Sequence, residues 1–387
     1  MGADVVVTGF GVRTAFGAGA PALRHGVFGG RPAFAPTSRF DTGPYRTPMA
    51  AAAPDGPSGT GSLRPELVAC GAEALDMAGL PAGEAAVLVG AAGDYTTITH
   101  FWRSGDDVEG ATAPYADAVP AVLAEAVADG LGLRGPRFAF TNACVASSAA
   151  IIHACRLIAS GRIEVALCAG GYLVEEEVFA KFDSGRALAR DGAVRPFSAD
   201  RSGLLLGDGV AAVVLESAGH ARSRGARPLS TVAGWGAASD AYHIARPHPD
   251  GAGLAAAARQ ALRRAGDPAG ATIDYVNAHG TGTRHNDVAE TRGLRSVFGA
   301  RAGSVPVSST KSTTGHLLEA AGVVEFVITM LALTDGVLPP TAGYTRPDPE
   351  CDLDCVPHVA RPADARRALT LNAAFGGANT ALVLERP

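Results

Sequence analysis

Residues 138–150 hold the first group that could do chemistry, a cysteine placed where an apolar run gives way to small residues (Phe-Ala-Phe-Thr-Asn-Ala-Cys-Val-Ala-Ser-Ser-Ala-Ala). We predict a buried strand that stops before Cys144 and a buried helix over residues 144–161, ended by Gly161. Unpaired N–H groups and the positive dipole end at the first helical turn favour a thiolate, the nucleophilic form of cysteine. On this stretch alone, a structural role for Cys144 as a small buried residue is slightly favoured.

Three later stretches place polar side chains in turns. His279 lies in Asn-Ala-His-Gly-Thr-Gly-Thr (277–283), at the carboxyl end of a predicted strand, where binding sites form in α/β sheets. Lys311 and His316 lie in the turn Ser-Ser-Thr-Lys-Ser-Thr-Thr-Gly-His before a long apolar helix. The segment Phe-Gly-Gly-Ala-Asn (375–379) is a tight turn whose glycines let the backbone approach another group closely. Taken singly, these stretches also fit a structural histidine, a surface lysine and an ordinary turn.

Apolar runs and helical periods alternate along the chain, and this alternation predicts an α/β fold with buried sheets. The predicted strands cover residues 4–8, 85–91, 164–170, 209–216, 229–235, 273–278, 305–308, 367–373 and 379–385. The predicted helices outside the cysteine segment cover residues 64–80, 116–132, 253–265, 287–298 and 316–335. We interpret residues 9–11 as a turn and the aromatic segment 94–102 as a loop.

A faint internal repeat supports a division into two related halves. Residues 207–216 (Gly-Asp-Gly-Val-Ala-Ala-Val-Val-Leu-Glu) resemble residues 376–385 (Gly-Gly-Ala-Asn-Thr-Ala-Leu-Val-Leu-Glu). Strands rich in alanine and valine often match by chance, so the repeat is weak evidence by itself. It predicts that the two halves meet near residues 217–228.

The composition excludes several classes of protein. The chain has 387 residues and a net charge of −5 without a basic block, which argues against binding to nucleic acid or an anionic membrane surface. We find neither a signal peptide nor an apolar run of about 18 residues, the length of a membrane-spanning helix. The six cysteines show no disulfide framework and no zinc-ligand pattern, so we expect a cytoplasmic protein without a metal.

Considered together, the chemical stretches resemble one family residue for residue. Cys144, His279 with Gly-Thr-Gly-Thr, Lys311 with Gly-His316, and Phe375-Gly-Gly with its following asparagine are similar to the β-ketoacyl synthases, the condensing enzymes of fatty-acid and polyketide assembly. The resemblance covers nearly the whole chain. It implies a thiolase-like α/β fold with two pseudo-symmetric βαβαβ-type halves in a layered α-β-α-β-α arrangement.

The resemblance also assigns the groups to the two halves. Residues 1–225 would form the N-terminal half with the nucleophile Cys144. Residues 226–387 would form the C-terminal half with His279, Lys311 and His316.

By the same resemblance, Cys144 accepts an acyl group from a phosphopantetheine thioester. A malonyl thioester then loses carbon dioxide, and the resulting carbanion attacks the acyl group on sulfur. The backbone N–H groups of Cys144 and Phe375 would form the oxyanion hole. His279 and His316 would be neutral imidazoles that stabilise the enolate, and which of the two acts as a base stays open.

The resemblance gives supporting roles to further residues. Lys311 would orient the groups around His316, and Glu325 would anchor Lys311 or polar groups of the loop. Phe375 would also be the gate of the acyl pocket. Two pairs of roles complete the implied site: pantetheine binding for Thr281 and Thr283, and structural support for Glu325 and Asn379.

The second histidine, His316, points to the elongating branch of the family, which depends on a carrier protein. We therefore expect an acyl carrier protein as partner, with phosphopantetheine carried by that partner and no cofactor of the chain's own. We also expect a homodimer, or a heterodimer with a ketosynthase-like chain-length factor. Two alternatives are a chain-length-factor-like partner of another synthase and an acyltransferase without decarboxylation, and Cys144 with both histidines argues against them.

Three positions depart from the pattern of the family. Asn142 replaces a threonine two residues before the cysteine, and Ala374 replaces a glycine before the gate phenylalanine. Glu319 stands where a small residue is usual. The aromatic segment 94–102 is expected to line or close an acyl tunnel, directly or across a dimer, so the acyl substrate and its chain length stay open.

Overall fold

The apolar runs of the chain form one mixed sheet through its centre. The computed structural model describes residues 4–53, 56, 61–104 and 115–387. The sheet has 11 strands in the order β11-β10-β14-β15-β9-β1-β8-β7-β5-β6, with β2 paired to β1. Its strands are β1 (Val5–Thr14), β2 (Gly17–Ala18), β5 (Ala86–Gly90), β6 (Arg137–Phe140), β7 (Val165–Tyr172), β8 (Gly209–Ser217), β9 (Ser230–Ser239), β10 (Tyr275–Asn277), β11 (Val307–Ser308), β14 (Arg367–Ala373) and β15 (Ala378–Glu385).

Strand order repeats on the two sides of the sheet's centre. From the centre outward the first side reads β1, β8, β7, β5, β6 and the second reads β9, β15, β14, β10, β11. In each set the first three strands are joined by antiparallel pairings and the last three by parallel pairings. The faint sequence repeat therefore joins equivalent strands, β8 and β15. The predicted pseudo-symmetric fold class is confirmed, while the boundary between residues 225 and 226 stays a prediction.

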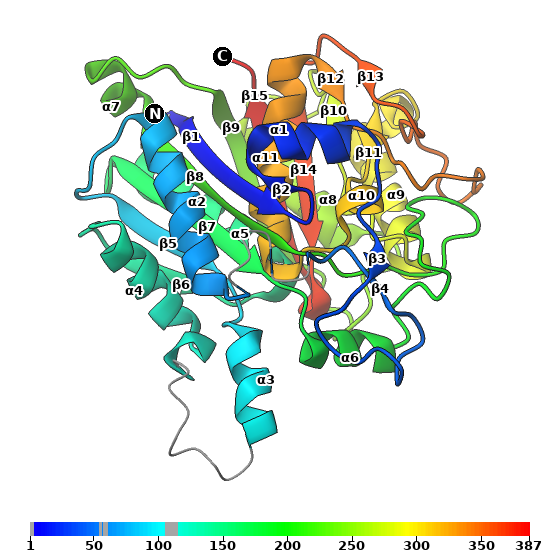
Figure 1. Ribbon diagram of the computed structural model, residues 1–387. Coiled ribbons are helices and arrows are strands. Elements are labelled where there is room, and N and C mark those ends of the chain that lie inside the picture. Colours follow the sequence, from blue (N-terminus) through cyan, green and yellow to red (C-terminus); the bar gives the residue numbers. More distant parts are fainter. Residues whose placement is uncertain (1–3, 54–55, 57–60, 105–114) are drawn as a thin grey trace.

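Helices form three layers, one between the two strand sets and one on the outer side of each set (Figure 1). Helices α5 (Ala146–Ala159) and α11 (Ala321–Asp335) contact strands of both sets and form the central layer. Of the 15 residues of α11, 13 are buried, as expected for a helix that is apolar on all sides. One outer layer holds α2 (Leu63–Ala78) and α4 (Pro120–Gly130), and the other holds α8 (Ala252–Arg264) and α9 (Arg284–Phe298). This is the predicted α-β-α-β-α order.

Smaller elements connect these layers. The remaining α-helices are α1 (Gly19–Leu23), α3 (Tyr95–Ser104), α6 (Glu176–Ser184), α7 (Ala218–Ser223) and α10 (Lys311–Thr314). Two further pairs of short strands are β3 (Ala35–Pro36) with β4 (Met49–Ala50), and β12 (Val337–Leu338) with β13 (Arg361–Pro362).

The turn predicted at residues 9–11 is wrong, because β1 continues through both of its glycines. A Cβ atom added at Gly9 would lie 2.1 Å from the carbonyl oxygen of Ala74 in α2. At Gly11 it would lie 2.3 Å from the carbonyl oxygen of Cys70, in the same helix. These glycines therefore let α2 pack close against the strand, and they do not turn the chain.

Two other predicted elements need correction. Residues 94–102 are not a loop, since Tyr95–Ser104 form α3, and the Asp94 carboxylate accepts the backbone N–H of Thr96 (3.1 Å) as a side chain at a helix start does. The long helix predicted over 316–335 begins only at Ala321. Before it, His316 lies in extended backbone, bridged to Leu206 of the other half.

Candidate active site

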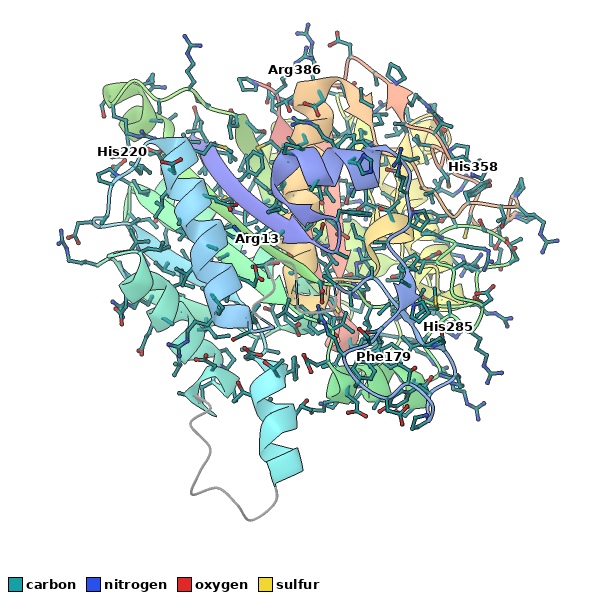
Figure 2. The ribbon with its side chains drawn as sticks, viewed as in Figure 1. Arg13, Phe179, His220, His285, His358 and Arg386 are labelled. Atoms are coloured by element: carbon teal, nitrogen blue, oxygen red, sulfur yellow. The ribbon has the colours of Figure 1, made fainter. Side chains whose placement is uncertain are left out.

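The residues proposed for chemistry follow parallel strands of both halves. Cys144 comes after β6 in the first half, whereas His279 follows β10, Lys311 follows β11 and Phe375 follows β14 in the second. Within each half the parallel strands present their carboxyl ends at one edge. The contact between His316 and Cys144 shows that the loops of the two halves meet. Figure 2 labels Phe179 of α6 beside the end at which β14 turns into β15, and His220 at the opposite side of the molecule.

Cys144 lies in a tight turn that precedes the buried helix. A 3-10 turn spans Ala143–Val145, so Cys144 is just outside α5 and not in its first turn as predicted. Ala143 has a φ of 51°, in the left-handed region that residues with a Cβ rarely adopt. Gly322 of α11 has no side chain, and a Cβ atom there would lie 2.5 Å from the backbone nitrogen of Ser148. The glycine therefore lets α11 pack closely against the start of α5.

The prediction that its position makes Cys144 a thiolate is wrong. Cys144 is 7% exposed, and this burial raises the pKa of its thiol to about 12, with a further upward contribution from the charge of Glu319. The Lys311 charge acts in the opposite direction but does not offset the loss of water. The sulfur is therefore a neutral thiol near pH 7 and needs a base when it attacks.

His316 is placed to be that base. Its Nε2 atom lies 3.1 Å from Cys144 Sγ. Two backbone hydrogen bonds hold the residue, because its N–H donates to Leu205 (2.7 Å) and its carbonyl accepts from Gly207 (3.1 Å). Burial, and then the Lys311 charge, lowers the pKa of His316 well below the usual range. The imidazole is thus neutral and one ring nitrogen can accept the thiol proton.

His279 faces the same space from the next strand. Its ring centroid lies 5.4 Å from that of His316 with an interplanar angle of 83°. The backbone N–H groups of His279 and Gly280 each donate to the Glu290 carboxylate (2.7 Å). Burial, the Lys311 charge and His316 lower the pKa of His279 well below its usual range, so this ring is also neutral.

Lys311 takes part in a fully buried polar cluster. Its Nζ contacts the Glu325 carboxylate, and Asn372 Nδ2 donates to the other oxygen of Glu325 (2.6 Å). Each of the three residues is 1% exposed. The predicted contact between Lys311 and Glu325 is present. The charge of Lys311 also lowers the pKa of His316.

The threonines predicted to hold pantetheine lie on the loop after His279. The hydroxyl groups of Thr281 and Thr283 are hydrogen-bonded to each other (2.9 Å). The Asp287 carboxylate accepts the backbone N–H of Gly282 between them (3.3 Å) and that of Phe197 (2.8 Å). The loop is therefore held in a fixed shape, and the role of its threonines towards pantetheine stays a prediction.

Phe375 begins the turn between β14 and β15. Its ring is 53% exposed and stacks on Phe182 of α6, with centroids 5.8 Å apart. Asn379 Nδ2 donates to the carbonyl of Gly377 (2.9 Å) and to Asp240 Oδ1 (3.2 Å), which fixes the turn. The structural support predicted for Asn379 thus has a physical basis, whereas the gate and the oxyanion hole stay predictions.

Some residues near the site were not found from the sequence. Glu290 lies 11 residues after His279 on a separate helix, and its burial becomes known only from the structure. Asn372 lies near the end of β14 between Leu371 and Ala373, which is a similarly weak signal. Over the described residues, no group of three or more metal-ligating side chains is assembled, and no helix is long and apolar enough to cross a membrane.

Comparisons with known proteins agree with this geometry. The chain matches the family descriptions "Beta-ketoacyl synthase, N-terminal domain" over residues 3–221 and "Beta-ketoacyl synthase, C-terminal domain" over residues 229–345. The tetracenomycin polyketide synthase ketoacyl synthase alpha subunit of Streptomyces glaucescens is 37% identical, with 99% of this chain and 97% of that protein covered. The 3-oxoacyl-(acyl-carrier-protein) synthase 2 of Vibrio harveyi is 41% identical over 69% of this chain and 67% of that protein.

A solved structure extends the similarity to the whole fold. The ishigamide ketosynthase/chain length factor has a TM-score of 0.93 and 32% identity, and 100% of both chains is covered. The site and the fold define a condensing enzyme with a thiolase-like architecture. The chain belongs to the β-ketoacyl synthase family.

Proposed function

We propose that the chain catalyses the decarboxylative Claisen condensation of an acyl group on Cys144 with a malonyl group delivered by an acyl carrier protein. The product is a β-ketoacyl thioester. The observation that carries this proposal is the 3.1 Å contact between His316 Nε2 and Cys144 Sγ, with a second neutral imidazole beside it. A chain-length-factor-like role without catalysis has no need for such a contact.

The first step transfers the acyl group to sulfur. Because the pKa of the Cys144 thiol is about 12, its proton must leave as the sulfur attacks the thioester carbonyl, and His316 accepts it. A new C–S bond forms at Cys144 while the C–S bond to the carrier's pantetheine breaks. The departing thiolate takes a proton back from the imidazolium, so both histidines end the step neutral.

The second step breaks a C–C bond of the malonyl thioester. Carbon dioxide leaves, and the electron pair moves into an enolate whose oxygen carries the negative charge. Neutral imidazole N–H groups of His279 and His316 stabilise that charge in a site from which water is largely excluded. The enolate carbon then attacks the acyl carbonyl on Cys144, and the C–S bond to the cysteine breaks, which releases the β-ketoacyl thioester. The departing sulfur takes up a proton from solvent through His316, because its thiol has a pKa of about 12 and the loss of carbon dioxide from a malonyl carboxylate leaves no proton behind.

The carrier protein and a second synthase-like chain are the partners that we propose. The name of the Vibrio harveyi relative includes an acyl carrier protein, and that of the ishigamide structure includes a chain length factor. We also propose that the enzyme acts in the reducing cytoplasm, which six free cysteines support.

Intact-protein mass spectrometry after incubation with acyl and malonyl carrier-protein thioesters tests the function directly. Wild type should gain the acyl mass and then release an extended product, whereas Cys144→Ala should gain no mass. Cys155→Ala is the matched control, because Cys155 is a buried cysteine of α5 outside the site and its replacement should leave loading intact. Loading that survives in Cys144→Ala, or no loading of wild type by any thioester, would refute the proposal.

A further inference from the structure

Glu319 is a buried acid that the proposed reaction does not use. It lies in the 3-10 turn Leu318–Ala320, three residues after His316, and is 6% exposed. Its Oε2 atom is buried and, within the described part of the chain, has no hydrogen-bond partner. Buried polar atoms in folded proteins almost always have partners, so this oxygen can accept one from outside the chain, a water molecule or a substrate group.

Backbone contacts fix Glu319 beside the nucleophile. Its carbonyl accepts a hydrogen bond from Ser147 Oγ (2.6 Å), and Ser147 Oγ accepts one from the backbone N–H of Val323 (3.0 Å). Ser147 lies one helical turn after Cys144, so the two 3-10 turns that hold Glu319 and Cys144 are locked together. The charge of Glu319 also acts on the Cys144 thiol, raising its pKa, which agrees with a short separation.

A second unpaired polar group faces the same region. Tyr172 ends β7, which packs against the turn of Glu319, and it is 1% exposed. Its hydroxyl is buried and, over the residues that the structure describes, unpaired. The ring of Tyr95 from α3 lies edge-on against that of Tyr172, with centroids 6.5 Å apart. Charge on Glu319 would raise the pKa of both tyrosines, so the three side chains share one neighbourhood.

These groups also adjoin the apolar core. Cys144, Leu318 and Tyr172 belong to the same hydrophobic cluster, and Tyr95 packs against it. A saturated acyl chain entering beside Cys144 would leave the carboxyl and the hydroxyl without partners. An acyl chain with an oxygen function near its carbonyl would hydrogen-bond to both, because a neutral carboxyl group and a phenol can each donate and accept.

We propose that Glu319 and Tyr172 form a polar subsite of the acyl pocket, which selects acyl groups with a hydroxyl or keto oxygen close to the thioester over saturated groups of the same length. This specificity rests on the proposed function, since it concerns the acyl group that Cys144 accepts. A site built to hydrogen-bond a substrate oxygen rejects the analogue without it strongly, because its own polar groups then stay unpaired. Glu319 is accordingly a specificity-determining residue for the loading step.

The test compares the loading of Cys144 by matched pantetheine thioesters, 3-hydroxybutyryl against butyryl, followed by intact-protein mass spectrometry. We expect wild type to load the hydroxyacyl group with at least a tenfold higher kcat/KM. Glu319→Leu should reduce this ratio at least tenfold, mainly by loading butyryl better, and Tyr172→Phe should reduce it about threefold. Glu319→Gln keeps a hydrogen-bonding group and should retain most of the preference. Glu125→Gln, at an exposed position of α4, is the matched control for handling and should match wild type.

The outcomes separate the two proposals. Equal ratios in wild type and Glu319→Leu, with both proteins acylated, would overturn the polar subsite and leave the proposed function standing. A preference of wild type for an aminoacyl thioester over the hydroxyacyl one would also overturn it, because Glu319 would then act as a buried anion. Failure of wild type to load any thioester would overturn the proposed function and the subsite with it. Should Glu319→Leu not fold, the ratio in Tyr172→Phe decides, and a value equal to that of wild type refutes the subsite.

Discussion

Replacing Glu319 with glutamine should change the stability of the protein in a way that depends on pH. Burial raises the pKa of Glu319 from an ordinary value of 4.5 to about 7, so the native state binds this proton more tightly than the unfolded chain does. The free energy of unfolding therefore falls as the pH rises from about 4.5 towards 7, because Glu319 ionises in the unfolded chain in this range and stays largely protonated in the native state. Glutamine cannot ionise and escapes this loss.

The pKa difference sets the size of the effect. Between pH 5 and pH 8.5, the free energy of unfolding of wild type should fall by about 2.5 kcal/mol relative to Glu319→Gln. For a chain of 387 residues this corresponds to a gain of about 3 °C in the Tm of the variant at the higher pH. The nearby Cys144, Tyr95 and Tyr172 do not titrate in this window, because burial raises the pKa of each far above it.

The assay is thermal unfolding of both proteins, followed by circular dichroism at the two pH values. Glu290, whose pKa burial also raises to about 7, is present in both proteins, so its contribution cancels in the comparison. Equal Tm differences at pH 5 and pH 8.5 would refute the reasoning. That result would mean that Glu319 is solvated or paired with a cation in solution, and the polar subsite would lose its basis.

Three further predictions follow from other contacts. Cys144 is the most exposed cysteine at 7%, so iodoacetamide should modify it before the other five. Peptide mapping measures the order of labelling, and equal labelling of all six cysteines would contradict the greater accessibility of Cys144. Lys311→Met leaves the buried Glu325 without a cationic partner and should lower the free energy of unfolding by about 3–5 kcal/mol in denaturant titrations. The double variant with Glu325→Leu should recover much of the loss, and no recovery would argue against the pair. Gly9→Ala places a Cβ against the carbonyl of Ala74 and should destabilise the protein by about 1–3 kcal/mol, so an unchanged denaturation midpoint would show that α2 does not pack this closely.

The strand positions could be predicted from the sequence because each buried strand is a short apolar run with its own turn signals. The repeat between residues 207–216 and 376–385 indicated two related halves. It did not give the strand order, which depends on pairings between residues far apart in the chain. Residues 94–102 were misread as a loop, because their helix is short and partly polar, with a start fixed by the single side chain of Asp94. The continuation of β1 through Gly9 depends on how close α2 lies, which no local pattern contains.

The chemistry of the site was likewise predictable only as far as local sequence patterns determine it. The motifs around Cys144, His279 and His316 predict the groups that we propose to react, and the structure brings the first and last of them into contact. Sequence position suggested a thiolate, yet the pKa of Cys144 is decided by how much water its surroundings exclude. The paired N–H bonds to Glu290 and the unpaired oxygen of Glu319 likewise exist only once separate segments have packed together.

The division of the reacting groups between two halves has a consequence during protein synthesis. Cys144 leaves the ribosome 135 residues ahead of His279 and 172 residues ahead of His316. At roughly 5–20 residues per second, the cysteine waits on the order of 10 s or more for its partners. Until the second half has been made, no imidazole lies beside its sulfur, so the pair that we propose for acyl transfer is assembled only after synthesis has passed His316.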